Sequence, residues 1–363
     1  GYRTDVRVCN LSYLQTDWYI NQMKSPAYNS PSLPIALTPK QYDQAKLNYA
    51  YIMNLSKDSL PLSTALNWLS SEDKRTKSLQ GYNERIDYIP AESLYIPIDS
   101  AVVANSPVLQ GIDKDKISKQ MNISLKGKNI VTKNEIAILY MLDGISKEGW
   151  KRPMYYATTV GSDMYLNMNP YFSLVGLAYQ ITPVNSGGMG SVDTERMYDN
   201  MMNKFLWGGI ENPKVYLDEN NRRMCRTLRL MFVRLIDALI DEGKDGKALN
   251  ALNFCMKQIP GYHVPHDYTS ISLAQDYFIL KEPAQGLELS ETIANKSLAN
   301  LKWYFQLRPN QLRSVMSEVG HDLAVVHNII EILNNAGQKE IAEVYNKEFE
   351  MYHAAWQRSQ QIR

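Results

Sequence analysis

The sequence predicts two parts, a mixed α/β (or α+β) domain over residues 1–210 and an all-α domain of helical repeats over residues 211–363. At 363 residues, the chain is long enough for two domains that each bury a core. Strand-like and helix-like patterns alternate in the first half, and strand patterns disappear beyond about residue 210. Its 44% hydrophobic and 21% charged residues are typical of a folded globular protein.

The elements of the first half follow from periodicity and from proline and cap positions. Residues 6–11 have a buried-strand pattern, and residues 16–23 have a helix pattern that opens with a Thr-Asp cap. Prolines flank two further extended segments, at 33–37 and 95–98, as is typical of strand ends. Helices are expected at 39–54 and 62–70.

The clearest helix signal of the first half is a capping box. Thr132 and Glu135 have the spacing at which each side chain satisfies a backbone amide of the other residue, and apolar residues follow at helical intervals. The strand-like stretches "RPMYYATTV" and "GLAYQITPV" come after it. This continued alternation favours a layered domain.

In the second half we expect only amphipathic helices, after a helix at 193–209 that closes the first domain. They are predicted at 222–242, 244–258, 269–281 and 283–301, with two more between 320 and 358. A tetratricopeptide-like pattern of large and small residues occurs in them, at Phe232, Leu235, Leu239, Ala248, Leu252 and Pro260, then at Leu273, Ala274 and Tyr277, then at Ile329, Ile330, Leu333 and Ala342. A plain helical bundle is the alternative.

Composition excludes several classes of function. The net charge of +1 provides no basic surplus for nucleic acid or anionic lipid. No run of about 18 apolar residues exists, so this part of the protein is not expected to span a membrane. We find no nucleotide or cofactor fingerprint and no catalytic constellation, so no cofactor and no catalytic residue is predicted. Three cysteines exclude a disulfide framework.

A metal site is not predicted. His263, His266 and Asp267 lie close together in sequence, but they lack standard ligand spacing and fall between two helices. A polar loop explains them better.

Two segments are candidate binding sites. Gly187, Gly188 and Gly190 precede Asp193, and such a loop before a helix either binds an anion through backbone amides or serves as a flexible linker. Residues 164–192 carry no charge, so Tyr165, Tyr171 and Phe172 either anchor the segment at a bilayer or partner surface or belong to the core.

Four stretches carry a family resemblance: "GYRTDVRVCNLSYLQTDWYINQM", "KRPMYYATTV", "GLAYQITPV" and "DTERMYDNMMNKFLWGG". In this order they resemble the region that follows the transmembrane part of bacterial protein O-mannosyl-transferase-like membrane proteins, a domain of unknown function followed by tetratricopeptide repeats. The resemblance covers about the first 210 residues. The start at Gly1, without methionine or signal peptide, also indicates a piece of a longer protein.

The resemblance implies a parent glycosyltransferase that uses a lipid-linked sugar in its membrane part, with this region on the periplasmic side of the inner membrane of a Gram-negative bacterium. Its implied partners are the transmembrane part of the parent and an acceptor protein or glycan, but no catalytic residue can be carried onto this sequence. We therefore expect an accessory region that positions an acceptor or partner protein. An interaction scaffold unrelated to sugar transfer and a glycan hydrolase are the alternatives.

Overall fold

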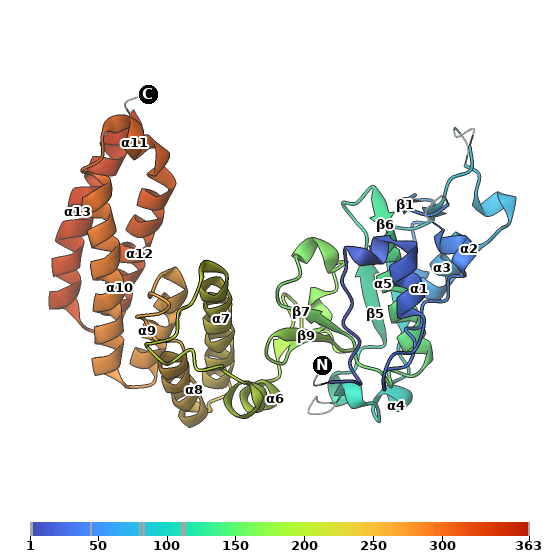
Figure 1. Ribbon diagram of the computed structural model, residues 1–363, viewed down its shortest axis with the longest axis horizontal. Helices are drawn as coiled ribbons and strands as arrows, with labels where there is room; N and C mark the ends of the chain where they lie inside the picture. The colour runs from blue at the N-terminus through green and yellow to red at the C-terminus, as the bar shows by residue number, and fades with distance from the viewer. Residues whose placement is uncertain (1–2, 44–45, 80, 82–83, 110–113, 362–363) are drawn as a thin grey trace. The chain divides into compact units, whose positions relative to one another are not determined.

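The computed structural model describes residues 3–43, 46–79, 81, 84–109 and 114–361. The chain forms two compact units, Gly1–Asp193 and Thr194–Arg363 (Figure 1). The division precedes the boundary expected near residue 210, because helix α6 (Thr194–Asp199) packs on α7 (Glu219–Asp241) of the second unit. Lys244 reinforces this packing with a 2.8 Å ion pair to Glu195.

The described residues of the first unit form three small sheets rather than one large one. Each sheet combines one parallel pair of strands with antiparallel pairing. Their strand orders are β3 (Tyr88–Ile89)–β1 (Tyr49–Ile52)–β6 (Ile130–Thr132), β10 (Ser191–Val192)–β8 (Phe172–Leu174)–β9 (Ala178–Ile181)–β7 (Tyr155–Ala157), and β2 (Leu60–Pro61)–β4 (Ser93–Pro97)–β5 (Gln120–Ser124).

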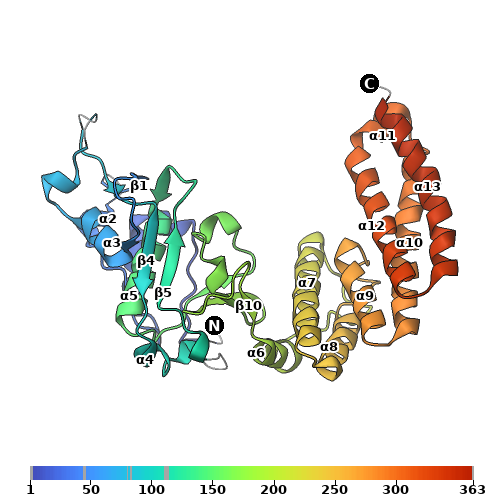
Figure 2. The same ribbon diagram turned by 180° about the vertical axis from the view of Figure 1, so that it is seen from behind.

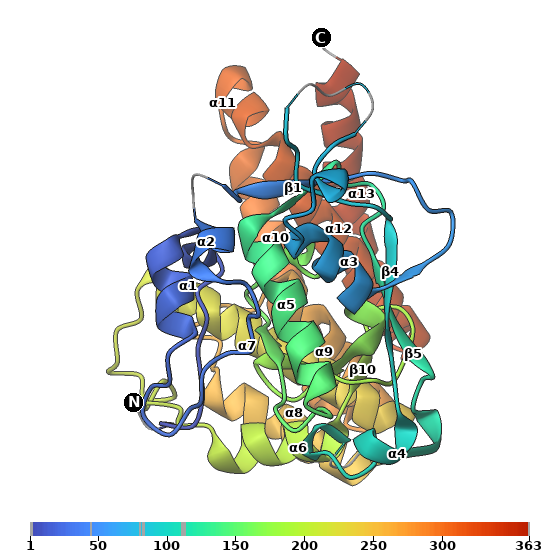
Figure 3. The same cartoon turned by 90° about the vertical axis from the view of Figure 1, so that its right-hand side faces the viewer.

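Helix α5 (Lys133–Lys147) is the centre of the first unit, and 12 of its 15 residues are buried. The predicted capping box is present, because the Glu135 side chain accepts from the Thr132 amide at 2.8 Å. Figure 3 shows α5 between α1 (Asp17–Met23) and α3 (Leu62–Ser70). Among the described residues of this unit, the other α-helices are the single turns α2 (Pro39–Tyr42) and α4 (Ser100–Val103).

Three expected elements of the first unit differ in the structure. Residues 6–11 form no strand, because no segment in the described part of the chain pairs with them. Residues 33–37 bury Leu33, Ile35 and Leu37 without forming a strand. The helix expected at 39–54 ends at Tyr42, since residues 49–52 instead pair with β6 as strand β1.

The second unit is helical, as predicted. Its helices beyond α7 are α8 (Asp245–Gln258), α9 (Ile271–Ile279), α10 (Pro283–Tyr304), α11 (Pro309–Ser314), α12 (Met316–Asn335) and α13 (Lys339–Gln361). Helices α7 and α8, α9 and α10, and α12 and α13 pack as consecutive pairs, and α10 also packs on α12 (Figure 2). The unit is therefore a stack of helix pairs.

Helix α6 is shorter than expected. It continues as a π-helical turn at Asn200–Lys204 and ends before Phe205, whereas the sequence indicated a helix to residue 209. Within the described residues, no helix combines the length and the apolar character needed to cross a membrane.

Candidate functional site

The three aromatic residues predicted as surface anchors lie in the core of the first unit. Tyr165, Tyr171 and Phe172 are all buried. Tyr165 and Phe172 pack edge to face with ring centroids 5.0 Å apart, and Phe172 stacks on Tyr179. The Tyr171 hydroxyl accepts a 2.8 Å hydrogen bond from the Asn122 amide. The anchor hypothesis requires exposed rings and is therefore corrected, because the charge-free segment supplies core side chains to the sheet of β7–β10.

The glycine-rich loop leads into strand β10 rather than directly into a helix. Gly187 and Gly188 are exposed, but the Gly187 amide donates to Asn185 Oδ1 and the Gly190 amide donates to the Gly187 carbonyl. A Cβ on Gly190 would lie 2.1 Å from the Phe172 carbonyl oxygen, so this glycine permits close packing on β8. The half-buried Asp193 donates its amide to the Leu174 carbonyl. Two amides of the loop, those of Gly187 and Gly190, therefore form hydrogen bonds within the loop itself.

Residues 259–270 of the second unit, between α8 and α9, form a loop that carries His263 and His266 and is called the histidine loop. Hydrogen bonds hold both histidines in place. His263 Nε2 lies 2.8 Å from the Asn212 carbonyl oxygen, and His266 Nδ1 lies 3.1 Å from Ser270 Oγ. Burial, and then the Arg229 charge, lower the pKa of His266 to about 4, so its imidazole is neutral near pH 7. Across the described part of the chain, no group of three or more His, Cys, Asp or Glu side chains is arranged to hold a metal ion.

Arg229 on α7 is fully buried and holds this loop in place. Its Nη2 donates to the carbonyls of Val264 at 2.8 Å and Ile259 at 3.0 Å, and its Nη1 donates to Ser270 Oγ at 3.2 Å. Burial lowers the pKa of the guanidinium, but a guanidinium stays charged at any physiological pH. The buried Arg229 guanidinium therefore fixes the backbone of the loop that carries His266.

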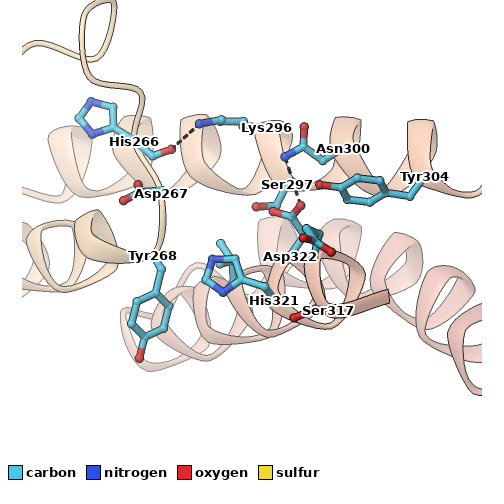
Figure 4. Close-up of a pocket in the computed structure, with 12 residues that line it drawn as sticks. His266, Asp267, Tyr268, Lys296, Ser297, Asn300, Tyr304, Ser317, His321 and Asp322 are labelled. Atoms are coloured by element: carbon cyan, nitrogen blue, oxygen red, sulfur yellow. Dashed lines mark hydrogen bonds between the residues drawn. The ribbon is translucent and has the colours of Figure 1, made fainter. Parts of the chain in front are cut away.

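A pocket of about 400 Å³ lies beside this loop, within the second unit (Figure 4). The loop supplies one wall, the C-terminal half of α10 supplies another and the N-terminal half of α12 supplies the third. Most of the lining side chains are polar or charged, among them Tyr268, Lys296, Asn300, Tyr304, His321 and Asp322.

The polar groups of the pocket are partly fixed by one another. Asn300 Nδ2 donates to Asp322 Oδ2 at 3.2 Å, and Lys296 Nζ donates to the His266 carbonyl at 3.2 Å (Figure 4). Burial, and then the Asp322 carboxylate, raise the pKa of Tyr304. At the rim, the exposed rings of Tyr268 and His321 are 5.8 Å apart. The pocket thus offers a carboxylate, an amine and aromatic faces to a polar ligand.

Only a small part of this pocket is predictable from the sequence. His266 and Asp267 fall in a predicted polar loop, but no sequence pattern joins them to residues 296–304 and 317–325. The only available signal was a set of polar residues at buried helical positions, such as Asp322 on α12 and Ser297 on α10.

The fold is that of a two-part region, in which an α/β unit with small sheets is followed by a unit of stacked helices. The chain belongs to the family described as TMEM260-associated domain 2, whose family model matches residues 1–196. This family is a domain of unknown function associated with a transmembrane protein. No curated protein and no solved structure matches the chain. The family match includes none of the pocket residues, so the pocket stands on its geometry alone.

Proposed function

We propose that this chain is the extracytoplasmic accessory region of a membrane glycosyltransferase-like protein, and that its helical unit positions an acceptor or partner protein. The association of the family with a transmembrane protein supports the link to a membrane parent. The resemblance of the first unit to O-mannosyl-transferase-like proteins supports sugar transfer by that parent and a periplasmic location. The reaction itself belongs to the membrane part.

The helical unit is proposed to be a degenerate tetratricopeptide-like array. Side chains at the large and small positions of the pattern are buried in all three helix pairs, including Phe232 and Ala248 in the first pair and Ile329 and Ala342 in the third. Stacked pairs of this kind present extended surfaces that bind polypeptides.

The observation that carries the proposal is the pocket beside the histidine loop. Its volume of about 400 Å³ suits a few side chains of a polypeptide or one sugar unit. Its lining side chains are mostly polar, so they suit hydrogen bonding to a polar ligand rather than apolar packing. Arg229 fixes the loop before any ligand arrives, which lowers the entropic cost of binding.

The test replaces the two exposed rim rings, Tyr268 and His321, with alanine in the full-length parent. Loss of acceptor binding and of acceptor glycosylation is expected, while a matched change of the exposed Val344 on α13 to alanine has no effect. Unchanged acceptor binding would refute the role of the pocket. Lost binding with intact sugar transfer would favour the scaffold alternative, and glycan turnover by this chain alone would favour a hydrolase.

A further inference from the structure

Residues 6–10 lie beside α1 and belong to no helix, turn or sheet strand. Exposure alternates along them, since Val6 and Val8 are 47% and 82% exposed whereas Arg7 and Cys9 are half-buried. A period of two is that of an extended strand with one face covered. The exposure of these residues therefore alternates as the sequence pattern does, but no sheet among the described residues includes the segment.

The backbone of this segment has an unused set of hydrogen-bonding groups. The amides of residues 6–9 donate no hydrogen bond to any residue that the structure describes. Among the carbonyls of the same residues, only that of Val8 accepts a hydrogen bond from a described residue, at 3.4 Å from the Tyr19 hydroxyl. Such a row of open donors and acceptors is the feature by which an edge strand pairs with another strand.

The covered face holds the segment in place. Arg7 Nη2 donates to the carbonyls of Gln22 and Ser25, both at 2.8 Å, at the C-terminal end of α1. The Asn10 amide donates to the Tyr19 hydroxyl at 2.8 Å. Because these contacts order the extended form in advance, a partner strand would meet little further entropic cost.

We propose that residues 6–9 are a docking strand, to which an extended polypeptide segment adds by β-strand pairing. The partner segment carries aliphatic or β-branched side chains at alternate positions, which pack beside Val6 and Val8. Main-chain hydrogen bonds supply the affinity, and the two valines set the register.

The chemistry of the segment favours a polypeptide over a lipid surface. A row of amides and carbonyls is matched by another extended backbone, whereas lipid headgroups do not match it. The Arg7 guanidinium is turned towards the protein, since Nη2 donates to two backbone carbonyls and Nη1 is buried, and Arg3 is paired with Asp5 at 2.7 Å. Binding to a membrane and pairing with a second copy of the chain are thus outcomes that the test must separate.

The test supplies a strand in a tethered form. The probe peptide Lys-Thr-Val-Thr-Val-Thr-Lys is fused ahead of Gly1 through a flexible linker of Gly and Ser, which gives an effective concentration on the order of millimolar. Amide hydrogen exchange is measured across the whole chain. Because every second amide of a strand points to one neighbour, we expect exchange to slow at least ten-fold at alternate residues, either Val6 and Val8 or Arg7 and Cys9.

Matched controls tie the effect to strand pairing. Two control probes carry proline at alternate positions, one set in each register, and one of them should abolish the slowing because its prolines lack the required amides. In the chain itself, Val8→Pro should weaken the slowing and Val8→Thr should retain it. Unchanged exchange in helix α5 shows that these variants are folded.

Four results would overturn the proposal. Two concern the probes: the tethered strand does not slow amide exchange at residues 6–9, or both proline probes slow it equally. The other two are that these amides already exchange slowly without a probe, or that the slowing disappears on dilution because a second copy of the chain dissociates. Protection of the same amides by phosphatidylglycerol vesicles, but not by the tethered strand, would indicate a membrane contact instead.

Discussion

Asn300 on α10 and Asp322 on α12 form a direct hydrogen bond between two helix pairs, with Nδ2 and Oδ2 3.2 Å apart. Asp322 is only 7% exposed, so its carboxylate depends on protein donors in place of water. The same bond shapes the wall of the pocket. Stability of the stack and geometry of the site are therefore coupled at this pair.

Replacing Asn300 with leucine should destabilise the chain by about 1–3 kcal/mol, because the buried Asp322 carboxylate loses a donor. Urea unfolding gives this value directly. The matched change at the exposed Asn334 of α12 should shift the free energy of unfolding by less than about 0.5 kcal/mol. Equal effects of the two leucines would show that the hydrogen bond does not matter.

Arg229→Met should cost about 2–4 kcal/mol, because the buried carbonyls of Ile259 and Val264 both lose their donor. The loss should appear in urea unfolding, and the amides of residues 259–270 should exchange faster. Arg226→Met is the control, since its 3.4 Å ion pair with Asp267 is partly exposed and such pairs contribute at most about 1 kcal/mol. If Arg229→Met is as stable as Arg226→Met, then Arg229 does not hold the histidine loop in place.

Two glycines of one loop should respond differently to alanine. Both have positive φ, 72° at Gly187 and 82° at Gly190, so each substitution costs about 1–2 kcal/mol of backbone strain. At Gly190 the new Cβ also collides with the Phe172 carbonyl, whereas at Gly187 it meets open space. Thermal unfolding should therefore show a clearly larger drop in Tm for Gly190→Ala. Similar drops would mean that the close approach to β8 relaxes cheaply.

Helices α3 and α5 were predictable from the sequence because their signals are local. The spacing of Thr132 and Glu135 predicted the start of α5, and Leu62–Ser70 forms a helix at the predicted residues. Strands of two or three residues, such as β3 and β10, are too short to leave a periodic pattern. Residues 6–9 show the opposite case, since a strand-like pattern cannot form a sheet without a partner.

The pocket could not be predicted because its walls meet only through tertiary packing. Asp322 and Asn300 lie 22 positions apart on two helices, and nothing in either local pattern indicates their contact. The aromatic residues failed as surface candidates for a related reason. A charge-free segment fits a core as well as an interface, and the packing of Tyr165 on Phe172 decides for the core.

The small residues Ala248 and Ala342 test the proposed repeat register. Both are buried, at 0% and 2% exposure, where consecutive helices pack closely. Leucine at either position should overpack the stack and cost about 1–3 kcal/mol. Leucine at the exposed Ala354 of α13 should be nearly neutral in the same thermal unfolding measurement. An unchanged melting temperature for Ala248→Leu would show that the register is wrong.

Asp276 on α9 should make stability depend on pH. It is 3% exposed, and no described residue forms a hydrogen bond with its Oδ2. Burial, and then the charge of Asp237, raise its pKa from the ordinary 3.8 to about 8. Between these values the folded chain holds a proton that the unfolded chain releases. The contribution of this group to stability is therefore greatest below about pH 4 and is lost as the pH rises towards 8.

The slope from this one proton is at most about 1.4 kcal/mol per pH unit. Asp276→Asn cannot ionise, so its free energy of unfolding should fall less steeply than that of the native chain between pH 5 and pH 8. The variant should then be the more stable of the two at about pH 9. Asp245→Asn, an exposed change on α8, should leave the slope unaltered. Parallel pH profiles for the native chain and Asp276→Asn would mean that Asp276 is ionised in the folded state and that its burial is offset by interactions with its surroundings.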